Sequence, residues 1–197
     1  MSQRIDIINV SLRLLGAESI TSLEDDAPEA QLIKDMYFIA RDAMLEIAEW
    51  TFATKRFLPA KETESPAWGW TSSFPIPSDI LRVTRVDRAD IVSLGSSMNR
   101  RPAEHEVEGR KILCNEDVIY CTGIRRIEDE GIYSPMFAEA FGYKLAAQAC
   151  LLITESNTKL QQMAGLYVEA IGKAKSRDGM QGTTRRLRNQ TLSRARY

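Results

Sequence analysis

The residues that could carry out catalysis are few and scattered along the chain. His105 is the only histidine, so a Ser-His-Asp or Cys-His arrangement can form only around this ring, and a two-histidine metal site is excluded. The ring stands in the charged run 104–106, which is typical of a solvated strand or loop. We interpret His105 as a surface residue and keep a catalytic role as the alternative.

Carboxylates occur in three clusters, and such pairs can act as acid and base or bind a hard cation. In the first cluster, Asp25 and Asp26 precede Pro28, a pattern that predicts a helix N-cap with proline in the first turn. The other two flank strand-like runs and are predicted to be turns. None has the spacing of a calcium loop. The clusters lie at 24–26, 116–117 and 128–130.

The cysteines and glycines show no pattern of a reactive site. The chain has three cysteines, Cys114, Cys121 and Cys150. Their odd number and their lack of paired spacing predict that they are small buried side chains and not a disulfide framework. No glycine-rich phosphate loop precedes a helix, and there is no Cys-x-x-Cys motif. We therefore assign no catalytic, cofactor-binding or metal-binding residue and predict that the protein is not an enzyme. The enzymatic alternative is a cell-wall or nucleic-acid hydrolase.

Charge is strongly segregated along the chain. The net charge is −1, but from Lys173 onward there are eight basic residues against Asp178 alone, and the rest of the chain holds 18 basic and 26 acidic groups. A basic tail on an acidic body can bind another copy, another acidic protein or nucleic acid. The predicted partner-binding residues are Arg185, Arg186, Leu187, Arg188, Arg194, Arg196 and Tyr197.

The motif Trp68-Gly69-Trp70 allows two interpretations. The two indoles can form a platform on which a ligand stacks, or they can pack at a corner of a β-rich region or in a subunit contact. We predict that Trp68 and Trp70 make a contact with a neighbouring subunit or with another protein.

Helical patterns occupy both ends of the chain. Apolar residues at spacings of three and four predict a helix over 5–15 that ends at Gly16, and a longer one from Pro28 to Trp50. A Ser134-Pro135 pair predicts the start of a third helix. The last helix is predicted to start at Ser156 or Asn157 and to end at 178–179.

The middle of the chain has a different character. Most of the prolines lie between Pro59 and Pro102, which excludes long helices there. Short β-like runs are predicted at 80–86, at 106–114 with a turn at 108–109, and at 118–124.

The predicted fold is mainly α, a bundle of about four helices with an inserted small β-rich subdomain and an extended C-terminal arm. The segments are 1–52 for the first helices, 53–130 for the insertion, 131–179 for the last helices and 180–197 for the basic arm. No apolar run reaches the roughly 18 residues of a membrane span, and no signal peptide is present, so no membrane anchor is expected.

Four segments resemble the tail tubular protein A, or head-to-tail adaptor, family of short-tailed bacteriophages. They span most of the chain in the family's order, but 87–104 carries no similarity. The segments are Ile7-Ile8-Asn9, Leu12 to Gly16 and Ile20 to Asp26; Tyr37, Arg41-Asp42 and Glu49 to Ala53; Gly69-Trp70 and Phe74 to Val83; and Phe137 to Ala140, Leu145-Ala146, Thr154 to Ser156, Tyr167 and Ala174, ahead of a terminal Arg-Tyr.

The resemblance implies a structural virion protein of the tail or neck, made in the bacterial host cytoplasm. Such a subunit forms a ring, expected to be twelvefold, that binds the portal protein and a tail nozzle protein similar to tail tubular protein B. Tail fibres are a further candidate partner. DNA would pass through the channel during ejection without sequence-specific binding. The alternative is a DNA-binding accessory protein that acts through its basic C-terminal tail.

Overall fold

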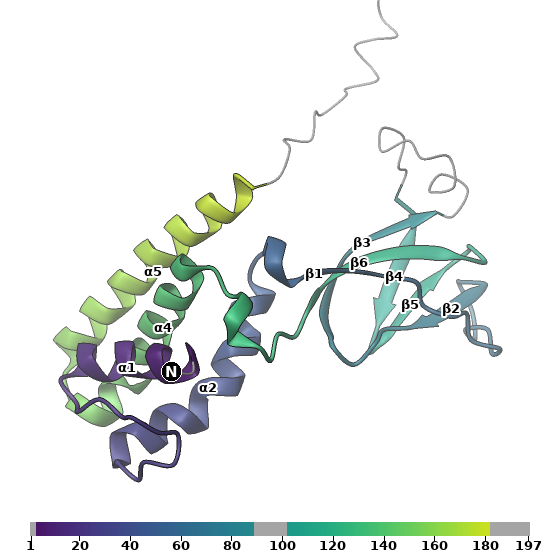
Figure 1. Ribbon diagram of the computed structural model, residues 1–197. Coiled ribbons are helices and arrows are strands. Elements are labelled where there is room, and N and C mark those ends of the chain that lie inside the picture. Colours follow the sequence, from purple (N-terminus) through teal and green to yellow (C-terminus); the bar gives the residue numbers. More distant parts are fainter. Residues whose placement is uncertain (1–2, 89–101, 182–197) are drawn as a thin grey trace, which may run out of the picture.

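The computed structural model describes residues 3–88 and 102–181, which form a helical part and a sheet part side by side (Figure 1). The helices are α1 (Gln3–Leu15), α2 (Pro28–Glu46), α4 (Pro135–Thr154) and α5 (Asn157–Gly179), with short 3-10 helices η1 (Thr51–Ala53) and η2 (Glu130–Ile132). The strands are β1 (Thr54–Phe57), β2 (Ser72–Pro75), β3 (Ile80–Arg88), β4 (His105–Glu108), β5 (Lys111–Cys114) and β6 (Ile119–Arg125).

The prediction of a mainly α class is wrong. The fold is a mixed α/β one, with 49% of the residues in helices and 20% in two three-stranded antiparallel sheets. Strands β1 and β2 were not predicted, because neither alternates between apolar and polar residues. Their partners lie far away in the chain: Thr54 of β1 pairs with Ile124, and Ser72 of β2 pairs with Cys114.

Helix α4 is the centre of the helical part and packs against α1, α2 and α5. Its Phe137, Phe141 and Leu145 are fully buried. Gly142 lets α1 approach closely, since a Cβ placed there would lie 2.7 Å from Cγ1 of Val10. Among the described helices, α4 alone has the length and mean hydropathy of a membrane span. Its burial against three helices explains part of this apolar character, whereas Leu151 and Leu152 near its end are exposed.

The helix ends mostly follow their local signals. Gly16 has a φ of +82°, and the amides of Gly16 and Ala17 donate to the carbonyls of Arg13 and Leu12, which is a Schellman C-cap. The predicted caps at Ser134 and Ser156 are also confirmed, because each side chain accepts a hydrogen bond from the amide three residues later. Ser156, and not Asn157, is therefore the N-cap of α5.

Two predicted boundaries of α2 are wrong. Its N-cap is Ala27, whereas the carboxylate of Asp25 accepts hydrogen bonds from the amides of Thr21 and Ser22 within the preceding loop. The helix ends at Glu46 and not at Trp50.

Trp50 is fully buried beyond the end of α2, and its Nε1 donates to the carbonyl of Met44 over 2.8 Å. The indole belongs to an aromatic cluster in which ring centroids lie 4.9–5.9 Å apart, close enough for edge and tilted contacts. This cluster closes the helical core beside the sheets. Its members are Trp50, Phe52, Tyr133 and Phe137.

The strand order is β1-β6-β3 in one sheet and β2-β5-β4 in the other (Figure 1). The predicted turn between β4 and β5 is confirmed, with Gly109 at a φ of +56°. A second core, which includes Phe74, Val86 and Ile112, lies in the sheet part. Ile124 of β6 instead belongs to the helical core, so β6 links the two parts.

Candidate interaction surfaces

The predicted partner-binding arm lies outside the described residues, from Arg185 to Tyr197. The structure does show where the preceding helix ends. The buried carboxylate of Asp178 accepts hydrogen bonds from the amide of Thr51 over 2.9 Å and from its hydroxyl over 2.8 Å. These bonds attach the end of α5 to η1, beside the junction between the helices and the sheets. From the sequence, Asp178 was predicted only as part of a helix end.

Trp68 and Trp70 lie in different environments and make no ring contact with each other in the described part of the chain. The indole of Trp70 is half-buried and donates to Oε2 of Glu106 on β4 over 3.2 Å. Trp68 is 85% exposed, next to Gly69 with a φ of +83°. The arrangement therefore gives no support to a stacked ligand platform. The predicted contact with another protein remains a prediction, now for Trp68 above all.

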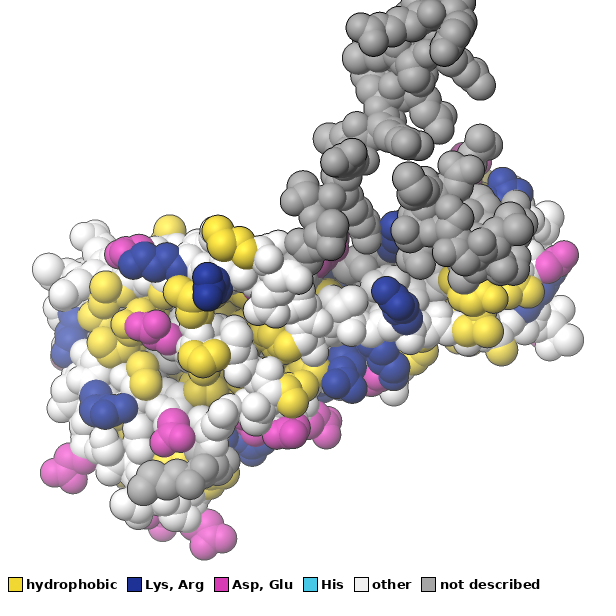
Figure 2. All heavy atoms as spheres, turned by 45° about the horizontal axis from the view of Figure 1, so that its top comes forward, with side chains coloured by type: hydrophobic (Ala, Val, Ile, Leu, Met, Phe, Trp, Pro, Cys, Tyr) yellow, Lys and Arg dark blue, Asp and Glu magenta, His cyan; other side chains and the backbone are white. Residues whose placement is uncertain are grey.

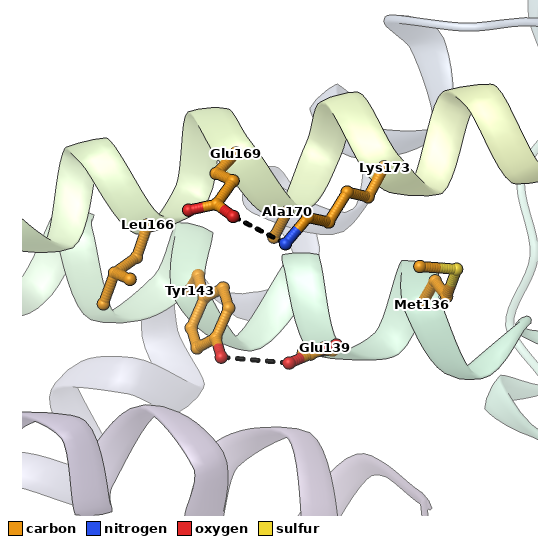
Figure 3. Close-up of a pocket in the computed structure, with 7 residues that line it drawn as sticks. All are labelled: Met136, Glu139, Tyr143, Leu166, Glu169, Ala170 and Lys173. Carbon is orange, nitrogen blue, oxygen red and sulfur yellow. Dashed lines mark hydrogen bonds and ion pairs between the residues drawn. The ribbon is translucent and has the colours of Figure 1, made fainter.

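A shallow pocket of about 160 Å³ lies between α4 and α5 (Figure 3). Tyr143 donates to Glu139 over 3.0 Å, and Lys173 pairs with Glu169 over 2.5 Å. The bond to Glu139 raises the pKa of Tyr143, and the ammonium of Lys173 lowers the pKa of Glu169. Each charge has a partner within the pocket or is exposed, so the pocket presents no group prepared for catalysis.

The helical part exposes large apolar side chains. Ile39 on α2 is 77% exposed and Val168 on α5 is 67% exposed. Figure 2 shows hydrophobic side chains gathered over this part of the molecule, between single charged groups. On α5, Gly165 and Gly172 have open space where a Cβ would stand. Glycine inside a helix costs about 1 kcal/mol relative to alanine, and nothing in the described chain approaches either residue.

The candidate catalytic residues are not brought together. His105 lies exposed on the edge strand β4, where its Nδ1 is 2.8 Å from the carbonyl oxygen of Ala103. In the second acidic cluster, Asp117 pairs with Lys61. In the third, Glu130 accepts hydrogen bonds from Arg4 and from the hydroxyl of Tyr37. No group of three or more His, Cys, Asp or Glu side chains within the described ranges is arranged to hold a metal ion.

All three cysteines are free and buried, as predicted. Burial raises the pKa of Cys121 from 9.0 to about 12 and also raises that of Cys114. A buried neutral thiol favours the folded state up to the pKa of the unfolded thiol, and this contribution is lost as the pH rises further.

We therefore expect the free energy of unfolding to fall between about pH 9 and pH 12, by up to ~1.4 kcal/mol per pH unit for one thiol. Urea unfolding at several pH values measures this slope. Cys121→Ala is expected to flatten it, because the alanine cannot ionise in either state. Parallel curves for the variant and the wild-type protein would contradict the assignment to Cys121.

Three arginines that were not predicted as a site are brought onto one face by the sheet β1-β6-β3. Arg56 on β1 pairs with Thr122 on β6, and Thr122 pairs with Arg85 on β3. Arg82 shares their face because β-bulges shift the register of β3 between Ile80 and Arg85. We call Arg56, Arg82 and Arg85 the arginine face. The three arginines can be read from the sequence, but the pairing of β1 and β3 with β6, which brings them together, cannot.

Comparison with known proteins adds no assignment. No protein-family model matches the chain, and no curated protein matches it.

Proposed function

We propose that this protein is a structural subunit of the ring adaptor that joins the portal to the tail nozzle of a short-tailed bacteriophage. The observation that carries the proposal is the set of exposed apolar side chains on the helical part, such as Ile39 and Val168. Contacts between subunits cover surfaces of this kind. The open positions at Gly165 and Gly172 on α5 suit the close approach of a neighbouring helix.

The resemblance to the adaptor family supports the same proposal, because each of its four segments supplies buried residues. Ile8, Tyr37 and Phe137 come from three of the segments and lie in the helical core. Phe74 comes from the other segment and lies in the sheet core. Each segment of the similarity therefore includes residues that determine packing, alongside exposed ones such as Arg13 and Glu24.

A ring of this kind forms when one surface of a subunit binds a different surface of the next subunit and the rotation closes. The portal protein and a nozzle protein would bind its two ends, and DNA would pass through its centre. The basic arm from Arg185 to Arg196 is proposed to bind acidic groups of the portal or of a neighbouring subunit.

The test is the native mass of the purified protein, alone and mixed with portal rings of the same phage. The full chain is expected to add a ring of subunits to the portal. A variant truncated after Gly179 is expected to bind the portal rings weakly or not at all. Failure of the full chain to bind the portal would contradict the proposed function. Portal binding by both proteins would support the ring adaptor and contradict the proposed role of the arm.

A further inference from the structure

The arginine face concentrates positive charge on a small area of a rigid sheet. Strands lie about 4.8 Å apart, so the Cα atoms of Arg56 and Arg85, separated by β6, are about 10 Å apart. On β3, Arg82 and Arg85 are successive residues of this face, and they pair with Ile124 and Thr122 of β6. Figure 2 shows Lys and Arg side chains gathered between the helical part and the far end of the sheets.

This charge is only partly neutralised. Arg85 pairs with Asp87 over 2.5 Å. Arg56 and Arg82 form no ion pair with any described residue, and the Nε of Arg82 is buried without a hydrogen-bond partner there. A buried donor without a partner is energetically unfavourable, so the guanidinium group of Arg82 keeps unused hydrogen-bonding capacity.

The neighbouring charges increase the imbalance. Arg126 follows the end of β6 and alternates onto the same side of the sheet as Ile124. It shares the carboxylate of Asp42 with Arg41, so two guanidinium groups bind one acid. Arg41 is buried, so the exposed Arg126 is the residue that continues the positive surface of the arginine face toward α2.

We propose that the arginine face binds the phosphate backbone of duplex DNA without reading its sequence. The planar guanidinium group offers several N–H donors and suits phosphate oxygens in bidentate contacts. The hydroxyl-bearing side chains Thr122 and Tyr120 alternate onto the same face and are donors of the type that contacts phosphates. The choice of duplex DNA among polyanions rests on the proposed function, whereas the phosphate chemistry rests on these residues alone.

Two observations favour DNA over an acidic protein as the occupant. Protein interfaces are apolar at their centre, but none of the large exposed hydrophobic residues belongs to β1, β3 or β6. The unpaired arginines stand on strands and hold a fixed spacing, which suits the regular phosphates of a duplex. The one aromatic residue on this face among the described residues, Tyr120, is only partly exposed, which gives little area for stacking on single-stranded bases.

The experiment compares two double variants of the full chain that remove the same number of charges. Arg56→Gln with Arg82→Gln alters the arginine face. Arg13→Gln with Lys175→Gln is the control on the helical part. Binding to a duplex of mixed sequence is measured by fluorescence anisotropy between about 0.05 and 0.2 M salt, and thermal melting checks that both variants are folded.

The first variant is expected to bind about tenfold or more weakly at ~0.1 M salt, with its salt slope reduced by about 1.8, because each phosphate contact contributes about 0.9 to the slope. The control is expected to stay within about twofold of the wild-type protein. Arg56→Lys with Arg82→Lys keeps the charge and should retain the slope with a smaller loss of affinity.

Equal weakening of the two Gln variants would show a general effect of net charge and overturn the proposal. Unchanged DNA affinity in the first variant, as expected if the basic arm alone binds DNA, would also overturn it. Normal DNA affinity with weaker addition to portal rings would make the face a protein contact instead. If the wild-type protein fails to join the portal but its DNA affinity depends on Arg56 and Arg82, the proposed function fails and the DNA-binding face stands.

Discussion

Replacing Phe137 with alanine is expected to lower the free energy of unfolding by about 3–5 kcal/mol. The ring is fully buried at the start of α4. Its centroid lies 5.0 Å from those of Trp50 and Phe52 and 4.9 Å from that of Tyr133. The variant loses the burial of the ring and leaves a cavity that these rigid neighbours cannot fill. Urea unfolding followed by circular dichroism measures the loss.

The matched control is Trp68→Ala, which removes a larger aromatic ring that is 85% exposed. Its effect on stability is expected to stay within about 0.5 kcal/mol. Tryptophan fluorescence gives a second measurement, since Trp50 should move toward water in the Phe137 variant before global unfolding. Similar costs for the two substitutions would contradict the burial that the structure assigns to Phe137.

Elements whose boundaries depend on neighbouring residues could be predicted from the sequence. The C-cap at Gly16 requires only a residue that tolerates positive φ after an apolar helix, and the N-cap at Ser134 requires only a hydroxyl before a proline. The hydrogen bonds that satisfy both ends lie within five residues. The turn at Gly109 is predictable for the same reason.

Elements that depend on distant partners could not be predicted. Strand β1 reads Thr-Lys-Arg-Phe and has no amphipathic pattern, because its stability comes from pairing with β6 more than sixty residues later. Asp25 and Asp26 resembled helix caps, but the loop amides of Thr21 and Ser22 compete for the carboxylate of Asp25. Missing short strands of this kind made the predicted fold too helical.

The same limit applies to the candidate surfaces. Clusters of like residues, such as the arginines of the tail, can be recognised in the sequence because their members are close together in the chain. Arg56 and Arg82 are 26 positions apart and share a face only after β1, β6 and β3 have paired. Asp178 likewise acquires its role only when α5 reaches Thr51.

Replacing Gly142 with alanine is expected to destabilise the protein by about 1–3 kcal/mol, even though alanine is the better helix former. The new Cβ would lie 2.7 Å from Cγ1 and 3.0 Å from Cβ of Val10 on α1. A β-branched side chain has little rotamer freedom inside a helix, so α1 must move away from α4. The control is Gly172→Ala on α5, where a Cβ meets open space and the variant should gain up to about 1 kcal/mol.

A double-mutant cycle identifies the cause of this cost. Val10→Ala removes the two methyl groups of the valine, and Cγ1 is the atom that the new Cβ would approach most closely. In that background, the Gly142→Ala change should cost little or become stabilising, because the helix propensity of alanine then outweighs the remaining contact. Chemical unfolding of the four proteins gives the interaction energy. Additive effects would show that the loss at Gly142 does not arise from the α1–α4 contact, and the close packing of these helices would then need another explanation.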